Sequence, residues 1–555
     1  MTLRVAIEKR VVAALQIVLP ALSQEVEVVA SEKFGHYQCN IAMKIAKEAR
    51  RPPREIALAL AEQLRDPIFS KVEVAGPGFI NFTFASSYLS QQLDKMVRDP
   101  RLGVALPAIK QRIIVEFSSP NIAKEMHVGH LRSTIIGDAL ARLFEFLGHD
   151  VLRLNHIGDW GTAFGMLIAY MEEEGGAADA DLPTLMQWYR ASKKRFDEDE
   201  AFKGRARAAV VALQGGDPAA RAAWETICAI SRRAFQEIYD LLEIRLEERG
   251  ESFYNSQLPW VVSDLEQKVL VALSVGAKCV FHEGYEIPLM VQKSDGGYNY
   301  DTTDMAAVVH RVRVEKADRI IVVTDAGQSL HFDLVKKTAI RAGYYDPQKV
   351  RFDHVVFGVV LGEDGKKFKT RSGDTVRLKD LLQEAVDRAH ALLEERGQKD
   401  PVLAQILAID AVKYGDLSSH RVSDYTFSFD RMLRFEGNTA VFILYSYVRV
   451  KGIKRRIGDV DLSGSYIILE HPSEVELGLT LLRFPEVLAM MERDLLPHYL
   501  TEYLYTLAQK FNGFFRDCRV EGVVEQNARL LLCDCTALVM ERGLDLLGLR
   551  TVDRM

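Results

Sequence analysis

The most constraining feature of the sequence is a strand, a polar loop, a helix and a second strand in direct succession. Residues Arg112–Phe117 are a nearly continuous apolar run, which predicts a buried strand. The spacing of apolar residues then predicts a helix over Val128–Leu147 that ends at Gly148, and Val151–Leu154 predicts the next buried strand. Such a βαβ unit builds doubly wound parallel sheets, which bind ligands at the carboxyl ends of their strands.

The same pattern returns later in the chain. Ile320–Thr324 and His354–Leu361 predict two further buried strands, with a helix predicted over Ser329–Arg341 between them. A charged, helical insertion over approximately residues 170–250 separates the two halves. We therefore expect an α/β, Rossmann-like domain with a doubly wound parallel sheet over residues 109–375.

The segments on either side of this domain have different patterns. Residues 1–86 predict a small α+β domain, with helices at its start and over Asn40–Arg65 and strands at Lys71–Ala75 and Ile80–Phe84. A polar helix follows, and the composition changes at Pro107, where we place the start of the next domain.

Beyond the α/β domain the chain is almost wholly helical by period. We expect a helical connecting region over residues 376–430 and an all-α domain over residues 431–555. The expected helices include Leu378–Glu395, Leu477–Leu495, Tyr499–Phe515 and Ala528–Leu547.

Composition limits the class of protein. A chain of 555 residues is too long for one hydrophobic core, and 48% hydrophobic with 27% charged residues is typical of globular domains. The apolar runs are too short for membrane spans, and the N-terminus lacks the layout of a signal peptide. We therefore expect a cytoplasmic protein that does not associate with a membrane. The six cysteines contain no CxxC pair, which favours reduced thiols over disulfides or zinc ligands. A net charge of −6 does not exclude a nucleic acid, because a large chain can carry a local basic face.

The loop before the long helix carries the clearest chemical pattern. It ends in His127-Val128-Gly129-His130, at the start of the predicted helix. A helix N-terminus offers free amide donors and a positive dipole end to a phosphate. The two histidines can donate to phosphate oxygens, and Gly129 lets a flat base approach the backbone.

This pattern resembles the first signature of class I aminoacyl-tRNA synthetases and related nucleotidyl transferases. The longer stretch Ser119–Thr134 is similar specifically to arginyl-tRNA synthetases. The resemblance continues in the same order through His156–Gly161, Tyr300–Asp304 and Thr324–His331 to the end of the chain. It therefore covers nearly the full length.

The resemblance implies a function and its partners. Members of this family activate L-arginine with ATP, which enters as its Mg²⁺ complex, and transfer the arginine to the 3′ end of tRNA(Arg). It also implies a monomer with no tightly bound metal, and an activation step that requires tRNA. In that reading, residues 1–86 are an appended domain that contacts tRNA, and residues 431–555 are the anticodon-binding domain.

The second signature of class I enzymes departs from its usual form. Where other members have a Lys-Met-Ser-Lys-Ser loop, this chain has Lys366–Gly373, and Thr370 occupies the place of the second signature lysine. The resemblance implies that Lys124 supplies the missing positive charge. The expected catalytic residues, which stabilise phosphoryl charge, are Lys124, His127, His130, Lys367 and Lys369, and the expected ATP-binding residues are His127, Gly129, His130, Gly158 and Asp159. The stretch around Gly158 and Asp159 equally fits a purely structural turn.

An arginine pocket needs carboxylates and fixed acceptors, because a guanidinium presents five donors in a rigid plane. Tyr300 and Asp304 are four residues apart and share a face if a helix begins at Tyr300. The resemblance assigns arginine contacts to Glu116, Ser119, Asn121, His127, Tyr300, Asp304 and Gln328. Glu251 is a further candidate carboxylate, although its flanking residues match the family poorly.

Candidate tRNA contacts lie in both flanking domains. A basic run from Arg449 to Arg456 lies beside Tyr445 and Tyr447, a mixture suited to phosphate contact and base stacking. A solvated helix face is the simpler alternative for this run, and a core position is the alternative for Phe79. The expected tRNA-binding residues are Phe79, Asn81, Tyr445, Arg449, Arg455, Arg456 and Met555.

Two other functions remain possible on the sequence alone. A small-cofactor adenylyltransferase shares the His-x-Gly-His chemistry, but it has no use for the long helical C-terminal part. A catalytically silent tRNA-binding paralogue would not need His127, His130, Asp304 or Gln328.

Overall fold

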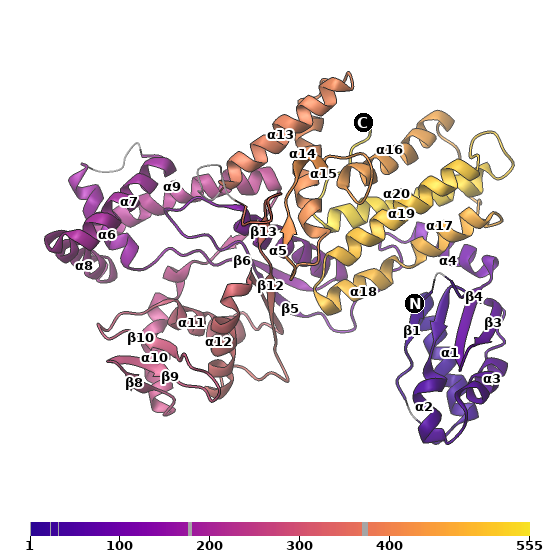
Figure 1. Cartoon of the computed structure of the whole chain (residues 1–555), viewed down its shortest axis with the longest axis horizontal. Helices are drawn as coiled ribbons and strands as arrows, with labels where there is room; N and C mark the ends of the chain where they lie inside the picture. Colours follow the sequence, from indigo (N-terminus) through magenta and orange to yellow (C-terminus); the bar gives the residue numbers. More distant parts are fainter. Residues whose placement is uncertain (1, 23, 32, 176–179, 369–375) are drawn as a thin grey trace. The chain divides into compact units, whose positions relative to one another are not determined.

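The computed structural model describes residues 2–22, 24–31, 33–175, 180–368 and 376–555. The chain divides into two compact units (Figure 1). The first unit consists of Met1–Leu106 together with Arg434–Met555, and the second unit is Pro107–Leu433. The composition change at Pro107 therefore coincides with the start of the second unit.

A parallel sheet forms the centre of the second unit. Its strand order is β12-β11-β5-β6-β7, and every neighbouring pair runs parallel. The strands are β5 (Arg112–Glu116), β6 (Asp150–Asn155), β7 (Glu247–Glu248), β11 (Arg319–Asp325) and β12 (Arg351–Phe357). The predicted Rossmann-like sheet is thus confirmed. The strand order reverses between β5 and β11, and ligands bind at such switch points in doubly wound sheets.

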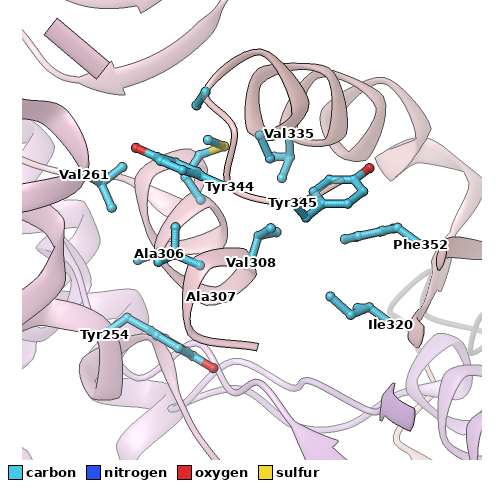
Figure 2. Close-up of a cluster of buried hydrophobic side chains, with 14 of the residues drawn as sticks. Tyr254, Val261, Ala306, Ala307, Val308, Ile320, Val335, Tyr344, Tyr345 and Phe352 are labelled. Carbon is cyan, nitrogen blue, oxygen red and sulfur yellow. The ribbon is translucent and has the colours of Figure 1, made fainter. Parts of the chain in front are cut away.

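Helices flank this sheet and bury its strands. They are α5 (Val128–Leu147), α11 (Tyr300–Arg313) and α12 (Ser329–Arg341). Helix α5 ends at Gly148, whose φ of 103° is readily adopted only by glycine, as the sequence predicts. Figure 2 shows Ala306, Ala307 and Val308 of α11 inside the hydrophobic core, with Ile320 of β11 nearby. Most of α11 is buried, which fixes the helix in the core, while its first residue, Tyr300, is exposed.

The insertion between β6 and β7 is helical, as predicted. It consists of α6 (Thr162–Glu173), α7 (Leu182–Glu198), α8 (Glu200–Gln214) and α9 (Pro218–Leu242), which pack on one another (Figure 1). A short 3-10 helix, η1 (Glu251–Gln257), and α10 (Leu258–Gln267) follow. The chain then forms a small antiparallel sheet that the sequence did not predict, made of β8 (Ala272–Ser274), β9 (Ala277–Val280) and β10 (Leu289–Gln292).

The predicted strand His354–Leu361 is wrong in one respect, because the strand is interrupted at Gly358. Strand β12 ends at Phe357, and the next residues form β13 (Val360–Leu361), which pairs with β14 (Tyr425–Thr426). A Cβ at position 358 would lie 2.6 Å from the backbone of Ser423, so only glycine fits. Strand β14 also interrupts the region predicted as helical, which otherwise contains α13 (Leu378–Glu395), α14 (Pro401–Leu417) and α15 (Phe429–Met432).

The N-terminal part of the first unit is an α+β domain around an antiparallel sheet of order β1-β2-β4-β3. Its elements are α1 (Leu3–Val18), β1 (Val28–Ala30), β2 (Tyr37–Cys39), α2 (Ile41–Ala49), α3 (Pro53–Gln63), β3 (Phe69–Ala75), β4 (Phe79–Phe84) and α4 (Ser86–Arg98). The single helix expected over Asn40–Arg65 is two helices, because Arg50 adopts a φ of 51° and Pro52 precedes Pro53. Strands β1 and β2 were not predicted.

The C-terminal part of the first unit is all-helical, as predicted. It contains α16 (Ala440–Ile457), α17 (Pro472–Leu482), α18 (Phe484–Asp494), α19 (His498–Asp517) and α20 (Gln526–Leu546). The helix expected over Leu477–Leu495 is two helices, because α17 ends at Leu482 and α18 begins at Phe484 with Pro485 in its first turn. All six cysteines are buried and unpaired. Among the described residues, no helix is long and apolar enough to cross a membrane.

Candidate active site

The loop after β5 has an unusual backbone. Ser118 and Ser119 have positive φ values of 73° and 47°, a region that residues other than glycine rarely adopt. Hydrogen bonds hold this shape: the Ser118 amide donates to Ser133 Oγ at 3.0 Å, and the Ser119 amide donates to Asn155 Oδ1 at 3.0 Å. Strained backbone that neighbouring groups enforce is concentrated at functional sites.

The loops after β5 and β6 are joined backbone to backbone. The Gly158 amide donates to Pro120 O at 3.1 Å, and the Ile122 amide donates to Gly158 O at 3.1 Å. A Cβ at position 158 would lie 2.1 Å from Asn121 Oδ1, so a larger residue there would displace the Asn121 side chain. This packing accounts for Gly158 without a nucleotide, and its role in ATP binding stays a prediction.

The two histidines of the first signature cap helix α5. His127 Nδ1 accepts from the Gly129 amide at 3.1 Å, and the His127 amide donates to His130 Nδ1 at 3.1 Å. The ring centroids are 4.0 Å apart. Because each Nδ1 accepts a hydrogen bond, a neutral ring carries its proton on Nε2, from where it can donate to a phosphate oxygen.

Electrostatics favour the neutral form of both rings. Burial, followed by the charge of Lys124, lowers the pKa of His127. Burial and the neighbouring His127 and Lys124 lower the pKa of His130 to about 3. Both histidines are therefore neutral donors near pH 7, and the exposed Lys124 lies close enough to both rings to lower their pKa.

The second signature loop begins on a hairpin after β13. Lys367 is exposed, and its backbone bridges Leu361. The Phe368 amide donates to Val360 O at 3.0 Å, which closes the hairpin. The predicted catalytic Lys369 and the neighbouring Thr370 lie outside the described residues.

The first turn of α11 carries the candidate arginine ligands. Helix α11 begins at Tyr300, so the expected common face of Tyr300 and Asp304 is confirmed. Both residues contact His331 of α12: its ring lies edge-on to Tyr300 at 4.9 Å, and its Nε2 is 2.6 Å from Asp304 Oδ2. The other ring nitrogen, Nδ1, is 2.9 Å from Asp301 Oδ1. Gln328 is exposed at the end of η2 (Ala326–Gln328), directly before α12.

Asp304 is an ionised carboxylate in this site. Burial by itself raises its pKa, but the hydrogen bond and charge of His331 outweigh burial and lower the pKa. His156 Nε2 is 3.7 Å from the other oxygen, Oδ1. Glu251 differs, because burial and the charges of Asp304 and Asp159 raise the pKa of Glu251 to about 8. Near pH 7, Asp304 therefore carries the negative charge and Glu251 is mostly protonated.

Two predicted ligands are paired with other protein groups. Glu116, at the end of β5, forms a buried ion pair with Arg311 of α11. Asp159 accepts from the Ser252 amide at 2.8 Å and from Ser252 Oγ at 2.6 Å, and Trp224 Nε1 donates to the Asp159 carbonyl at 2.8 Å. The structure thus shows Glu116 and Asp159 in structural contacts, and direct roles in arginine and ATP binding stay predictions.

Two buried polar atoms near the loops have no hydrogen-bond partner within the described ranges. They are the Ser119 hydroxyl and His156 Nδ1. Buried polar atoms are almost always hydrogen-bonded in folded proteins, so an unsatisfied pair at the carboxyl ends of β5 and β6 fits a polar ligand.

The candidate tRNA residues of the first unit fall into two groups. Asn81 is buried in the sheet and accepts from Gln38 Nε2 at 2.8 Å, and Phe79 is partly exposed at the start of β4. On α16, Arg449 lies over the ring of the exposed Tyr445 at 4.9 Å.

The end of the same helix reaches the C-terminal residues. Arg455 donates to the Asp553 carbonyl at 2.7 Å, next to the partly exposed Met555. Arg456 is exposed and lies 3.8 Å from Glu521. The basic run and the C-terminal residues are therefore neighbours in the first unit.

His331, His156 and Asp301 lie in the segments that resemble the family, but no role for them was predicted from the sequence. The structure places all three around Asp304. The signal in the sequence was a histidine on the predicted helix, seven residues after the predicted strand Ile320–Thr324. This signal is weak without the contact between His331 and Asp304.

Comparison with known proteins agrees with this geometry. Residues 92–429 match the catalytic-domain model of class I tRNA synthetases for arginine, residues 443–555 match the DALR anticodon binding domain, and residues 3–84 match the N-terminal domain of arginyl tRNA synthetase. The chain is 57% identical over 562 residues to the arginine–tRNA ligase of Protochlamydia amoebophila, covering 98% of this chain and 96% of that protein. It is 49% identical over 579 residues to the arginine–tRNA ligase of Nostoc punctiforme, covering 100% and 99%.

Solved structures give the same result. The arginyl-tRNA synthetase of Plasmodium falciparum matches with a TM-score of 0.89 and 33% identity, over 100% of this chain and 99% of that chain. The arginyl-tRNA synthetase of Thermus thermophilus matches with a TM-score of 0.82 and 26% identity, over the full length of both chains. Three domain models match in the expected order, and the relatives are about 50% identical over nearly the full length of the chain. This chain therefore belongs to the arginyl-tRNA synthetase family of class I.

Proposed function

We propose that the chain is a catalytically active arginine–tRNA ligase, which charges tRNA(Arg) with L-arginine at the expense of ATP. The observation that carries the proposal is the ionised Asp304 beside Tyr300, in the same unit as a helix N-terminus capped by two neutral histidines. A silent tRNA-binding paralogue has no need for a charged pocket of this kind.

The first reaction forms arginyl-adenylate. A carboxylate oxygen of arginine attacks the α-phosphorus of ATP, which enters as its Mg²⁺ complex, and the bond to the bridging oxygen of pyrophosphate breaks. The Nε2–H groups of His127 and His130 donate to phosphate oxygens as charge builds up, and Lys124 and Lys367 add positive charge. Asp304 and Tyr300 hold the guanidinium, assisted by Ser119, Asn121 and Gln328.

The second reaction transfers the arginyl group to tRNA. A ribose hydroxyl of the 3′-terminal adenosine attacks the carbonyl carbon of the adenylate, and AMP leaves. Both steps need positioning and charge stabilisation, so a protein nucleophile is not required.

Recognition of tRNA belongs to the first unit in this proposal. The α16 basic run and Met555 contact the anticodon end, and the N-terminal domain contacts another part of the tRNA. Phe79 at the start of β4 is the better placed of the two N-terminal candidates, because Asn81 is buried and already bonded to Gln38. The enzyme acts as a monomer in the cytoplasm, where its three substrates are found.

Aminoacylation of total tRNA with each of the twenty amino acids in turn tests the function. Only arginine is expected to be attached, and arginine-dependent exchange of pyrophosphate into ATP is expected when tRNA is present. Exchange with a small-cofactor acceptor and none with arginine would identify an adenylyltransferase instead. Binding of tRNA without single-turnover charging would identify a silent paralogue.

A further inference from the structure

The contacts of the His331 ring are not those of an ordinary packing residue. Its ring is largely buried between α11 and α12, with Nδ1 2.9 Å from Asp301 Oδ1 and Nε2 2.6 Å from Asp304 Oδ2. A neutral imidazole carries one N–H, and its other nitrogen is an acceptor that a carboxylate repels. Two short contacts to two carboxylates therefore require the doubly protonated imidazolium.

Each of the two carboxylates is itself held in place. Asp301 Oδ2 accepts from the Met290 amide at 3.2 Å and from Asn299 Nδ2 at 3.2 Å. Asp304 is bound by His331 through Oδ2, while His156 remains 3.7 Å from Oδ1, longer than a hydrogen bond. Oδ2 of Asp304 thus accepts the hydrogen bond from the imidazolium, and Oδ1 is the oxygen that can accept a hydrogen bond from a ligand.

We infer that His331 is a positioning residue of the arginine pocket, a fixed cation that keeps Asp304 ionised and turns its Oδ1 toward the guanidinium. This inference rests on the proposed function, since it assigns Asp304 to the guanidinium. The charge of His331 does not cancel that of Asp304, because Asp301 balances it. The three groups together keep one net negative charge for the substrate.

The protonation of His331 follows from its surroundings. Burial lowers its pKa, but the hydrogen bonds and charges of Asp301 and Asp304 outweigh burial and raise the pKa to about 9. The titratable and charged groups around His331 and Asp304 are Asp301, Tyr300 and Arg311 on α11, His354 on β12, His156 after β6, and Glu251 at the start of η1. The stabilisation that His331 contributes is complete below the ordinary histidine pKa of about 6.5 and is lost as the pH rises through about 9.

The test uses the full-length enzyme with tRNA present and measures arginine-dependent pyrophosphate exchange in the parent, His331→Phe and His331→Asn. Phenylalanine fills the space without a donor, and asparagine keeps one neutral donor. Removing a charge-assisted hydrogen bond to Asp304 is expected to lower kcat/KM for arginine about 10- to 100-fold, mainly through a higher KM, with the KM for ATP unchanged. The asparagine variant is expected to fall between the other two.

A pH series separates positioning from packing. The ratio of the arginine KM in His331→Phe to that in the parent is expected to shrink as the pH rises through about 9, because only the parent has a proton to lose there. Taking this ratio removes the titration of the substrate itself. A packing role predicts a ratio that does not change with pH.

His354→Phe is the matched control, since His354 contacts the neighbouring Phe332 ring and Thr324, and within the described part of the chain it forms no hydrogen bond or ion pair with a carboxylate. Its arginine KM is expected to equal that of the parent. An arginine KM in both His331 variants equal to the parent value, or lower, overturns the inference. A parent enzyme that shows no arginine-dependent exchange rejects the proposed function itself, so the two failures are distinguishable.

Discussion

Replacement of Asp304 by asparagine tests the charge of the proposed arginine pocket. The side chain keeps its shape, but the site loses the negative charge that compensates a desolvated guanidinium. In the variant His331 keeps Asp301 as its one close carboxylate partner. The pocket then becomes more positive by one unit, which disfavours a cationic substrate.

The magnitude follows from the pair that is broken. Two unit charges about 4 Å apart at an effective dielectric constant of about 20 interact by about 4 kcal/mol. Loss of one partner of a buried, hydrogen-bonded charge pair costs about 2–5 kcal/mol in measured cases. At about 1.4 kcal/mol per decade, kcat/KM for arginine is expected to fall between about 30-fold and several thousand-fold.

The decisive measurement is pyrophosphate exchange with arginine and with citrulline. The neutral ureido group of citrulline has nearly the shape of a guanidinium but presents an oxygen acceptor, which Asp304 repels and an asparagine amide can donate to. Asp304→Asn is therefore expected to narrow the selectivity for arginine, while the KM for ATP stays constant. Asp333→Asn on α12 is the control, because it removes a charge that pairs with Lys337 3.8 Å away. If arginine-over-citrulline selectivity is the same in Asp304→Asn as in the parent, Asp304 is only a structural acid.

The sequence predicted those elements whose ends carry their own local signals. Helices α5, α12 and α13 have the bounds that the apolar period indicated, and α5 has a glycine where its last turn needs a left-handed residue. Strands β1 and β8 have three residues each, too few for a strand period to appear in the sequence. The break at Gly358 is also invisible locally, because its cause is the backbone at Ser423.

The candidate site shows the same division between local and distant information. The positions of His127 and His130 follow from the junction between the loop after β5 and helix α5. Their neutral state follows from the burial of both rings at this junction. The environment of Asp304 depends on His331, which is 27 residues away in the chain and on another helix. The resemblance to a known family singled out the carboxylate, but its charge state required the tertiary contact.

Three further predictions concern the lysine of the first signature loop, the basic run and the helix that bears the histidines. Lys124→Ala is expected to slow adenylate formation about 10²–10³-fold in single-turnover measurements without changing arginine affinity, and an unchanged rate would remove it from the mechanism. Arg455→Ala combined with Arg456→Ala is expected to weaken tRNA binding and flatten its salt dependence, with arginine and ATP binding as controls, since fewer counterions are released. Arg132 is fully buried on α5, where its Nε donates to Oδ1 of the equally buried Asp416 at 3.3 Å and its Nη1 donates to the Gly358 carbonyl at 2.7 Å. Arg132→Met removes the ion-pair partner of Asp416, whose pKa burial already raises, so the free energy of unfolding is expected to fall by about 3–5 kcal/mol. Adding Asp416→Leu removes the carboxyl group that has lost its partner and is expected to restore much of that loss. A denaturant titration in which the double variant is no more stable than Arg132→Met would refute the buried pair as the cause.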